Sequence, residues 1–468
     1  MAQLAEIDAL LAREPDHVEL RYLRAGLLAQ AGRTDEARDA YLAALALEPR
    51  HFGALNDLGT LLYAAGFRAA ARTAYAEAIR HHPGNPTARI NLANALLADG
   101  EADEARLHYE AALIAAPDHP DAHQGLANLL QDAGESEAAE AHRQRSYRAR
   151  TITTLPYRGD GPPCRVLLLV SATGGNVPTQ GLLDPTRFAV SVLVVEAHTA
   201  ETVLPPHDLV FNAVGDADLC PEGLAAAEAV LTRTDAPVIN PPARVRPTGR
   251  AAVASRLSGL PRVRAPKVVL ARRETVTKAA KAFAWPLLVR SPGYHTGRNF
   301  VKVETPGELE AAVAALPGQD LLLIEWLDAR DARGLSRKFR VMAIGGRLYP
   351  LHLALSRDWK VHYFTADMAE APDHRAEEAA FLADMAAVLG AEAVADLDAI
   401  AGGLGLDYAG IDFGLGPDGE VLLFEANATM VVNPPDADPR WDYRRASTQA
   451  ILDAARGLMI ARARRPSS

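Results

Sequence analysis

Small and apolar residues recur with a fixed spacing of 34 positions through the first 150 residues. The recurring positions are Gly32, Gly66, Gly100 and Gly134; Ala37, Ala71, Ala105 and Ala139; Tyr41, Tyr75 and Tyr109; and Pro15, Pro49, Pro83 and Pro117. A glycine permits a tight turn, an alanine lets two helices approach closely, and a proline stops a helix. The pattern therefore predicts antiparallel helix pairs that stack into an all-α solenoid.

This spacing, with glycine at the turn, alanine at the helix contact and proline at the helix end, resembles the tetratricopeptide repeat (TPR). The resemblance covers residues 1–150. The last repeat departs from it, because Arg143 stands where a tyrosine is expected. The resemblance implies either a concave groove for a peptide or protein partner, or a scaffold that dimerises or braces the rest of the chain.

The chain changes character after residue 150. Residues 151–163 contain three prolines and two glycines and are expected to form a linker. Apolar runs typical of buried parallel strands then alternate with a helical stretch at 225–232. The runs lie at 165–170, 190–195, 208–212 and 238–240. The alternation predicts a small doubly wound α/β domain over residues 164–250.

Two further apolar runs, at 411–415 and 421–424, flank a Gly-Pro-Asp-Gly turn and predict a β-hairpin. The hairpin would bring Asp412 near Glu425 and Asn427. Glu425 and Asn427 are two positions apart, so they project from the same face of a strand. Carboxylate and amide oxygens suit Mg²⁺ when nucleotide phosphates fill its remaining positions. The hairpin therefore predicts a magnesium site that handles a nucleotide.

Strands with polar residues precede this hairpin. Arg290 ends one predicted strand, and a loop with Gly293 and Gly297 follows it. A second strand, at 321–327, carries Glu325, and a third, at 338–347, carries Arg340. A helix is predicted from His374 to Leu389. A glycine loop of this kind can fold over phosphates with its backbone N–H groups.

The ordered series of Arg290, glycine loop, Glu325-Trp-Leu327, Arg340 and acidic hairpin resembles the ATP-grasp superfamily, which includes D-alanine–D-alanine ligase and glutathione synthetase. The resemblance covers roughly residues 164–460. It implies a multidomain chain in which a pre-ATP-grasp α/β domain at 164–250 precedes an α+β ATP-grasp catalytic domain at 251–468.

The resemblance also implies an activity. We expect an ATP- and Mg²⁺-dependent ligase that joins a carboxylate to an amine or similar nucleophile through an acyl-phosphate intermediate. The repeat array would present a peptide or protein substrate. The alternatives are an ATP-grasp kinase, which stops after phosphoryl transfer, and a non-catalytic scaffold that only binds a nucleotide.

Roles for single residues follow from the same resemblance. Glu325, Trp326 and Leu327 would hold the adenine, and Asp328 or Asp331 would bind the ribose hydroxyls. Arg290 would contact the α- and β-phosphates, and the Gly293–Gly297 loop would close over the β- and γ-phosphates. Asp412, Glu425 and Asn427 would hold one or two Mg²⁺ ions, and Arg340 would stabilise the transferring phosphoryl group.

Two positions depart from the family pattern, because Arg290 and Arg250 stand where lysines are usual. An arginine keeps the charge but offers a planar fork in place of a point charge. Arg357, Lys360 and His362 lie in the region that faces the acceptor in the family. They would bind a carboxylate or act as a base, and a polar edge strand is the alternative interpretation.

Bulk composition narrows the class of protein. A chain of 468 residues is expected to form two or three domains. Its net charge of −10 argues against nucleic-acid binding. Cys164 and Cys220 are far apart, which predicts neither a disulfide framework nor a zinc site. The start lacks signal-peptide features and no apolar run is long enough to span a membrane, so we expect a cytoplasmic protein. The composition is compatible with a monomer and with a homo-oligomer.

Overall fold

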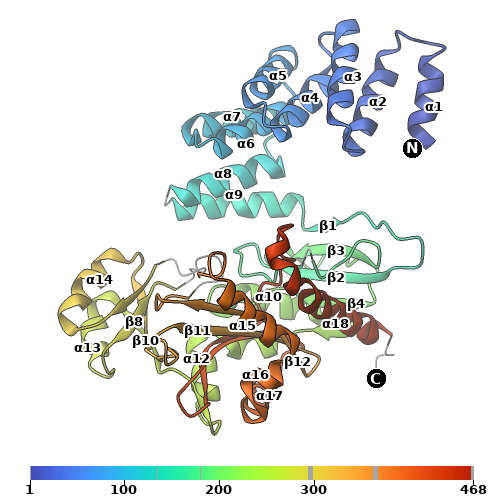
Figure 1. Ribbon diagram of the computed structural model, residues 1–468. Helices are drawn as coiled ribbons and strands as arrows, with labels where there is room; N and C mark the ends of the chain where they lie inside the picture. Colours follow the sequence, from blue (N-terminus) through green and yellow to red (C-terminus); the bar gives the residue numbers. More distant parts are fainter. Residues whose placement is uncertain (1, 134, 180, 293–298, 362–366, 465–468) are drawn as a thin grey trace. The chain divides into compact units, whose positions relative to one another are not determined.

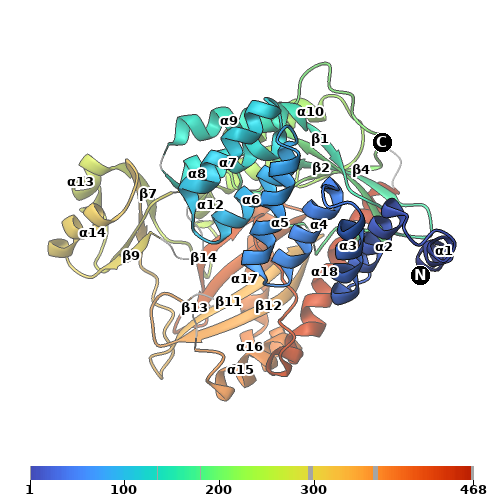
Figure 2. The same cartoon turned by 90° about the horizontal axis from the view of Figure 1, so that it is seen from above.

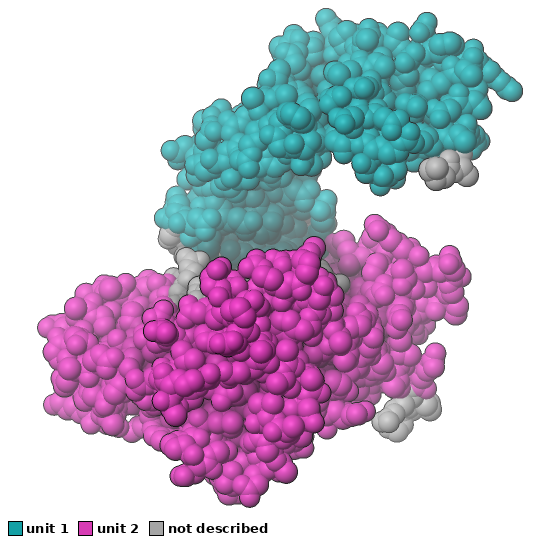
Figure 3. Space-filling model, viewed as in Figure 1, with its two compact units in different colours: residues 1–150 teal, residues 151–468 magenta. Residues whose placement is uncertain are grey.

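The computed structural model describes residues 2–133, 135–179, 181–292, 299–361 and 367–464. Gly134, Gly293, Gly297 and His362 therefore lie outside the described residues, and the predictions for them stay predictions. The chain divides into two compact units, residues 1–150 and 151–468, which Figure 3 colours separately.

The first unit consists of successive antiparallel helices (Figure 1). Their bounds are α1 Ala2–Leu11, α2 Val18–Gln30, α3 Thr34–Leu47, α4 Phe52–Ala64, α5 Arg68–His81, α6 Pro86–Ala98, α7 Ala102–Ala115, α8 Pro120–Asp132 and α9 Ser136–Ala149. Gly32, Gly66 and Gly100 occupy the turns with φ of 72°, 85° and 87°, a backbone region that favours glycine. The predicted helical array is confirmed.

The recurring alanines and tyrosines form the interior of this array. Ala37, Ala71 and Ala105 have no exposed surface. Tyr109 of α7 is 1% exposed and packs on Gly125 of α8, where an added Cβ atom would overlap its ring. The 34-residue spacing in the sequence therefore reflects contacts that recur between adjacent helices.

The second unit is an α/β region built on three sheets. The elements of its first part are β1 Ile152–Thr154, β2 Cys164–Val170, β3 Phe188–Val194, η1 Val195–Ala197, β4 Leu209–Asn212, α10 Pro221–Leu231, β5 Val238–Ile239, α11 Pro242–Val245, η2 Arg246–Thr248 and α12 Arg250–Leu257. Strands β2 to β5 are parallel, in the order β3-β2-β4-β5. Strand β1 lies within the predicted linker and pairs antiparallel with β3.

The rest of the second unit carries the other two sheets (Figure 2). The elements are β6 Val263–Arg264, β7 Val268–Arg272, η3 Arg273–Thr275, α13 Val276–Ala280, β8 Leu287–Arg290, β9 Phe300–Val303, η4 Pro306–Glu308, α14 Leu309–Ala315, β10 Asp320–Glu325, β11 Ser336–Ile344, β12 Arg347–Ser356, α15 Pro372–Ala383, α16 Met385–Leu389, α17 Ala391–Leu404, β13 Tyr408–Leu415, β14 Val421–Asn427, η5 Pro439–Arg444 and α18 Arg445–Ala463. The second sheet has the order β7-β10-β8-β9, and the third has the order β12-β11-β13-β14-β6.

The sheets of this unit do not share a single core. One cluster of buried side chains joins the first sheet, through residues such as Leu167 and Phe211, to the third, through Phe339 and Ile411. The second sheet encloses a cluster of its own with α13 and α14. Leu287 and Val289 of β8 belong to that cluster, whereas Leu288 between them faces the opposite side, as alternation along a strand requires.

One predicted helix is interrupted. The stretch from His374 to Leu389 is divided into α15 and α16 at Asp384, whose backbone is extended. The Asp384 carboxylate accepts a hydrogen bond from the Ala387 N–H, so the side chain caps a new helix in place of continuing the old one. The predicted hairpin at 411–427 is present as β13 and β14.

The contact between Gly125 and Tyr109 makes a stability prediction. Gly125→Ala should lower the free energy of unfolding by about 1–3 kcal/mol, because the buried ring has no room to move away. The matched control is Gly84→Ala, since nothing lies within 4 Å of the Cβ position at Gly84. Urea unfolding followed by circular dichroism measures both, and equal stabilities would contradict the packing role of Gly125.

Candidate functional site

A cavity of about 790 Å³ lies in the second unit, where the second and third sheets face each other. Residues of β8 and β10 line one side, and residues of β11 to β14 line the other. The loop after β2 reaches it through Gly175, Asn176 and Pro178. The ends of the cavity differ in chemistry.

One end of the cavity is apolar and aromatic. Leu288 and Ile324 pack there with Phe300, Trp326 and Trp359. The Trp359 ring lies 5.9 Å from Trp326 and 5.3 Å from Phe300, centre to centre, in edge-to-face arrangements. Flat apolar walls of this kind suit a planar heteroaromatic ring.

The other end carries a row of polar side chains across the third sheet. The backbone register places His352 of β12 opposite Arg340 of β11, Arg340 opposite Asp412 of β13, and Asp412 opposite Glu425 of β14. Asn427 follows Glu425 on the same strand and pairs with Gly410. We call these five residues, His352, Arg340, Asp412, Glu425 and Asn427, the polar row.

Two bulges align the polar row. Between the pairs Asp412–Glu425 and Phe413–Leu423, residue Phe424 is an extra residue on β14. Leu423 can therefore join the buried core while Glu425 lines the cavity. A similar shift next to Arg340 makes Leu351 the extra residue on β12. Bulges commonly redirect side chains in this manner near functional sites.

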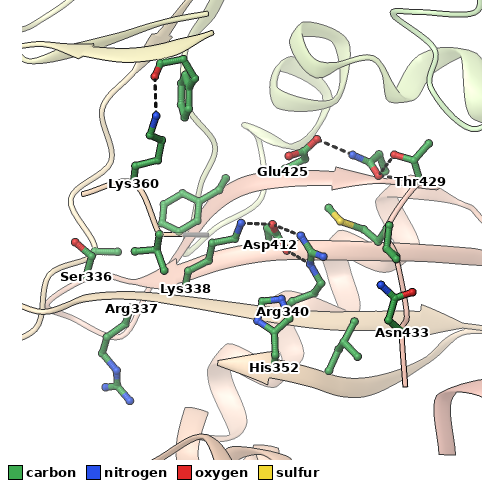
Figure 4. A pocket seen from close by; sticks show the side chains of 18 of the residues that line it. Ser336, Arg337, Lys338, Arg340, His352, Lys360, Asp412, Glu425, Thr429 and Asn433 are labelled. Carbon is green, nitrogen blue, oxygen red and sulfur yellow. Dashed lines mark hydrogen bonds and ion pairs between the residues drawn. The ribbon is translucent and has the colours of Figure 1, made fainter. Parts of the chain in front are cut away.

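The carboxylate of Asp412 is held by two cations (Figure 4). Arg340 Nη2 lies 2.8 Å from Oδ2, Arg340 Nε contacts Oδ1, and Lys338 Nζ lies 2.7 Å from Oδ2. Burial alone would raise the pKa of Asp412, but Arg340 and Lys338 hold it well below its usual range. Asp412 is therefore ionised at neutral pH although it is only 1% exposed.

Glu425 lies in a different setting. Its Oε1 accepts hydrogen bonds from Arg250 Nη2 at 2.6 Å and Asn427 Nδ2 at 2.8 Å, and its side chain is 27% exposed. Burial raises the pKa of Glu425, but the charges of Arg250, Arg290 and Lys338 together outweigh it and the net shift is downward. Arg290 is 7% exposed, and burial together with the nearby Arg250 charge lowers its pKa to about 10.

His352 completes the polar row on the side away from Glu425. It is 4% exposed, and burial followed by the Arg340 charge lowers the pKa of its imidazole well below the usual value. The ring is therefore neutral at physiological pH. A neutral imidazole next to a row of charges can donate one hydrogen bond and accept another.

The structure brings most of the predicted nucleotide residues to the cavity. Arg250, Arg290, Glu325, Trp326, Leu327, Arg340, Asp412, Glu425 and Asn427 all line it. The Glu325 carboxylate accepts hydrogen bonds from Arg264 Nη2 at 2.8 Å and the Lys267 N–H at 3.0 Å, so its side chain braces the strand end.

Asp328 and Asp331, the two candidates for ribose binding, do not belong to the cavity lining. Asp328 is paired with Arg330, and Asp331 with Arg333 at 2.7 Å. Each pair spans two residues, so the sequence offered a local partner that satisfies the acid without any ligand.

The predicted acceptor residues separate in the structure. Lys360 lines the cavity, and its Nζ lies 3.3 Å from the Phe300 carbonyl oxygen. Arg357 is exposed and outside the lining, with its backbone N–H directed to Asp367. His362 lies outside the described residues.

Lys338 and His352 are cavity residues that the sequence interpretation missed. Lys338 lies two positions before Arg340, so both project from the same face of β11, whereas Arg337 points to the opposite side (Figure 4). Alternation along the strand was the signal that could have identified Lys338. His352 required the register between β11 and β12, which no local pattern provides.

Two other kinds of feature are absent from the described residues. No cluster of three or more His, Cys, Asp or Glu side chains with metal-binding geometry occurs in the described part of the chain. No helix in the same ranges is long and apolar enough to cross a membrane.

Comparison with known proteins identifies the first unit. The tetratricopeptide repeat family model matches residues 4–51, 56–120 and 91–151. The comparison with curated proteins returned no match.

Solved structures were compared as well. MamA from Desulfovibrio magneticus RS-1 is 20% identical, with 31% of this chain and 85% of that chain covered and a TM-score of 0.29. Pseudomonas aeruginosa pilF is 21% identical over 30% of this chain and 65% of that chain, with a TM-score of 0.29. A thermophilic TPR protein of Thermus thermophilus is 22% identical over 31% of this chain and 81% of that chain, with a TM-score of 0.28. The family match, together with the helical array, identifies the N-terminal unit as tetratricopeptide repeats.

Proposed function

We propose that the second unit contains an ATP-grasp domain, residues 251–468, which binds ATP with Mg²⁺ and joins a carboxylate to an amine or similar nucleophile. The observation that carries this proposal is the division of one cavity into an aromatic end and a cationic, acidic end. A nucleotide has the same division, with an apolar planar base at one end and charged phosphates at the other.

The base would lie between Leu288, Ile324 and the Trp326 ring, beside the Glu325–Leu327 segment that ends β10. The phosphates would then extend toward Arg250, Arg290 and the polar row. Arg290 is buried at the end of β8, where its charge is only weakly screened by water. This arrangement supports the phosphate-binding role that the sequence assigned to it.

The chemistry of the donor set fits magnesium. Glu425 exposes part of its carboxylate to the cavity, and Asn427 lies beside it on the same strand. Oxygen ligands of this type hold Mg²⁺ together with phosphate oxygens. The ion would supply positive charge that neutralises the phosphates during transfer. Glu425 and Asn427 are the residues that would hold it.

The polar row then supplies the electrostatics of phosphoryl transfer. The substrate carboxylate attacks the γ-phosphorus of ATP, ADP leaves, and an acyl phosphate forms. An amine displaces inorganic phosphate from that intermediate and loses a proton. Arg340, fixed by Asp412, provides positive charge for the equatorial oxygens in both steps.

The repeats suggest the size of the substrate. TPR arrays commonly bind peptides or proteins, and here the array precedes the proposed catalytic unit in the same chain. We infer that the acceptor or donor belongs to a peptide or protein. A kinase would use the same residues and omit the second step.

Two observations favour a non-catalytic nucleotide-binding scaffold. Asp412 is occupied by Arg340 and Lys338, and arginines stand at both positions where the ATP-grasp resemblance leads us to expect lysines. Such a site could bind a nucleotide without turning it over. The two experiments that follow separate binding from turnover.

Nucleotide binding is tested first. ATP with Mg²⁺ at about 100 times its dissociation constant should raise the free energy of unfolding by about 2.7 kcal/mol, and EDTA should reduce the gain. Arg290→Ala should weaken binding by about 1.5–3 kcal/mol through loss of a charged contact. Arg272→Ala, an exposed arginine on β7, is the control. Calorimetry measures the affinities, and an unchanged affinity in Arg290→Ala would refute its role.

Turnover is tested with two substitutions that keep the shape of the side chain. Glu425→Gln should abolish phosphate release and cost less stability than Asp412→Asn does, because Glu425 is partly exposed and gives up one ion pair, with Arg250. Asp412→Asn should lower the free energy of unfolding by about 3–5 kcal/mol, because it leaves two cations without their buried partner. Phosphate release that requires an added amine identifies a ligase, phosphate release without an amine identifies an ATPase, and ADP formation without phosphate release identifies a kinase. Full activity of Glu425→Gln would overturn the proposed site.

A further inference from the structure

Asp412 lines the cavity but presents almost no surface to it. Arg340 engages both of its carboxylate oxygens, Lys338 engages Oδ2 a second time, and the residue is 1% exposed. A carboxylate engaged in this manner anchors the cations around it. An ion that enters from the cavity would have to displace both side chains to reach it.

Glu425 is the accessible carboxylate of the polar row. Its hydrogen bonds from Arg250 and Asn427 both end on Oε1, and the side chain keeps 27% of its surface exposed. An entering ion can therefore reach Oε2 of Glu425 on β14. The Oδ1 atom of Asn427 accepts hydrogen bonds from the Thr429 N–H and hydroxyl, each at 2.9 Å, and would exchange the hydroxyl for the ion.

Lys338 places a positive charge beside Asp412, at the polar end of the cavity. It projects from β11 on the same face as Arg340, and its side chain is 19% exposed although it touches a buried acid. The ammonium group of a lysine is a compact point charge with three donors, whereas a guanidinium is a flat fork. Among the charged side chains, an ammonium is thus the better substitute for a small cation.

We propose that Lys338 takes the place of a second magnesium ion, so that the site binds one Mg²⁺ per nucleotide through Glu425 and Asn427. This inference rests on the proposed function, since it assumes that the cavity binds ATP. Lys338 would contribute a fixed positive charge to the phosphates, and Asp412 would hold that charge in position together with Arg340. A second divalent ion next to this ammonium would be repelled by it.

The number of bound metal ions tests the inference. Full-length protein is saturated with a non-hydrolysable ATP analogue and titrated with Mn²⁺, and the bound ions are counted from the electron paramagnetic resonance signal of free Mn²⁺. We expect one tightly bound Mn²⁺ per protein. Lys338→Gln should bind two, because the fixed charge is gone, and Lys338→Arg should again bind one. Lys281→Ala, an exposed lysine after α13, should behave as the unaltered protein does.

Each result of this experiment either supports or overturns the inference. Two tight Mn²⁺ ions in the unaltered protein would overturn the inference and leave the proposed function intact. Equal stoichiometry in Lys338→Gln and Lys338→Arg would also overturn it, provided that circular dichroism shows both variants folded. Failure of the analogue to bind would overturn the proposed function and, with it, the inference. The count in the unaltered protein does not depend on whether any variant folds.

Discussion

The ion pair of Asp412 with Arg340 and Lys338 is the interaction on which the candidate site depends. Burying a carboxylate costs several kcal/mol unless cations and hydrogen bonds compensate, and here two cations on the adjacent strand do so. The same contacts fix the direction of the cations. The same ion pairs therefore stabilise the third sheet and position the positive charge in the cavity.

The two ends of the cavity belong to parts of the unit with separate cores. The aromatic end is one face of the second sheet, whose other face packs on α13 and α14. The polar row lies on the third sheet, which shares its core with the first. Each sheet can therefore satisfy its own packing with Leu, Val and Phe on one face. The face toward the cavity is left to the aromatic and polar side chains that line it.

Prediction from the sequence succeeded where a signal was local or periodic. The spacing of 34 residues predicted the helix pairs, and the Gly-Pro-Asp-Gly turn predicted the pairing of Asp412 with Glu425. It missed His352, which joined the row only through the pairing of β12 with β11, a long-range register. Asp328 and Asp331 pair with arginines two residues away, and their ribose role stays a prediction. An acid in a sequence does not show whether its partner is a ligand or a neighbour.

The extra residue Phe424 has a consequence for how this chain can change. Upstream of it, Leu423 faces the core, and downstream of it, Glu425 faces the cavity. Loss of one residue here would restore simple alternation and exchange the two faces for the remainder of β14. Glu425 and Asn427 would then be buried and an apolar residue would line the cavity in their place. The site therefore requires a fixed number of residues between Leu423 and Glu425, whatever the residue between them is. An insertion or deletion there would disrupt the site more than a substitution would.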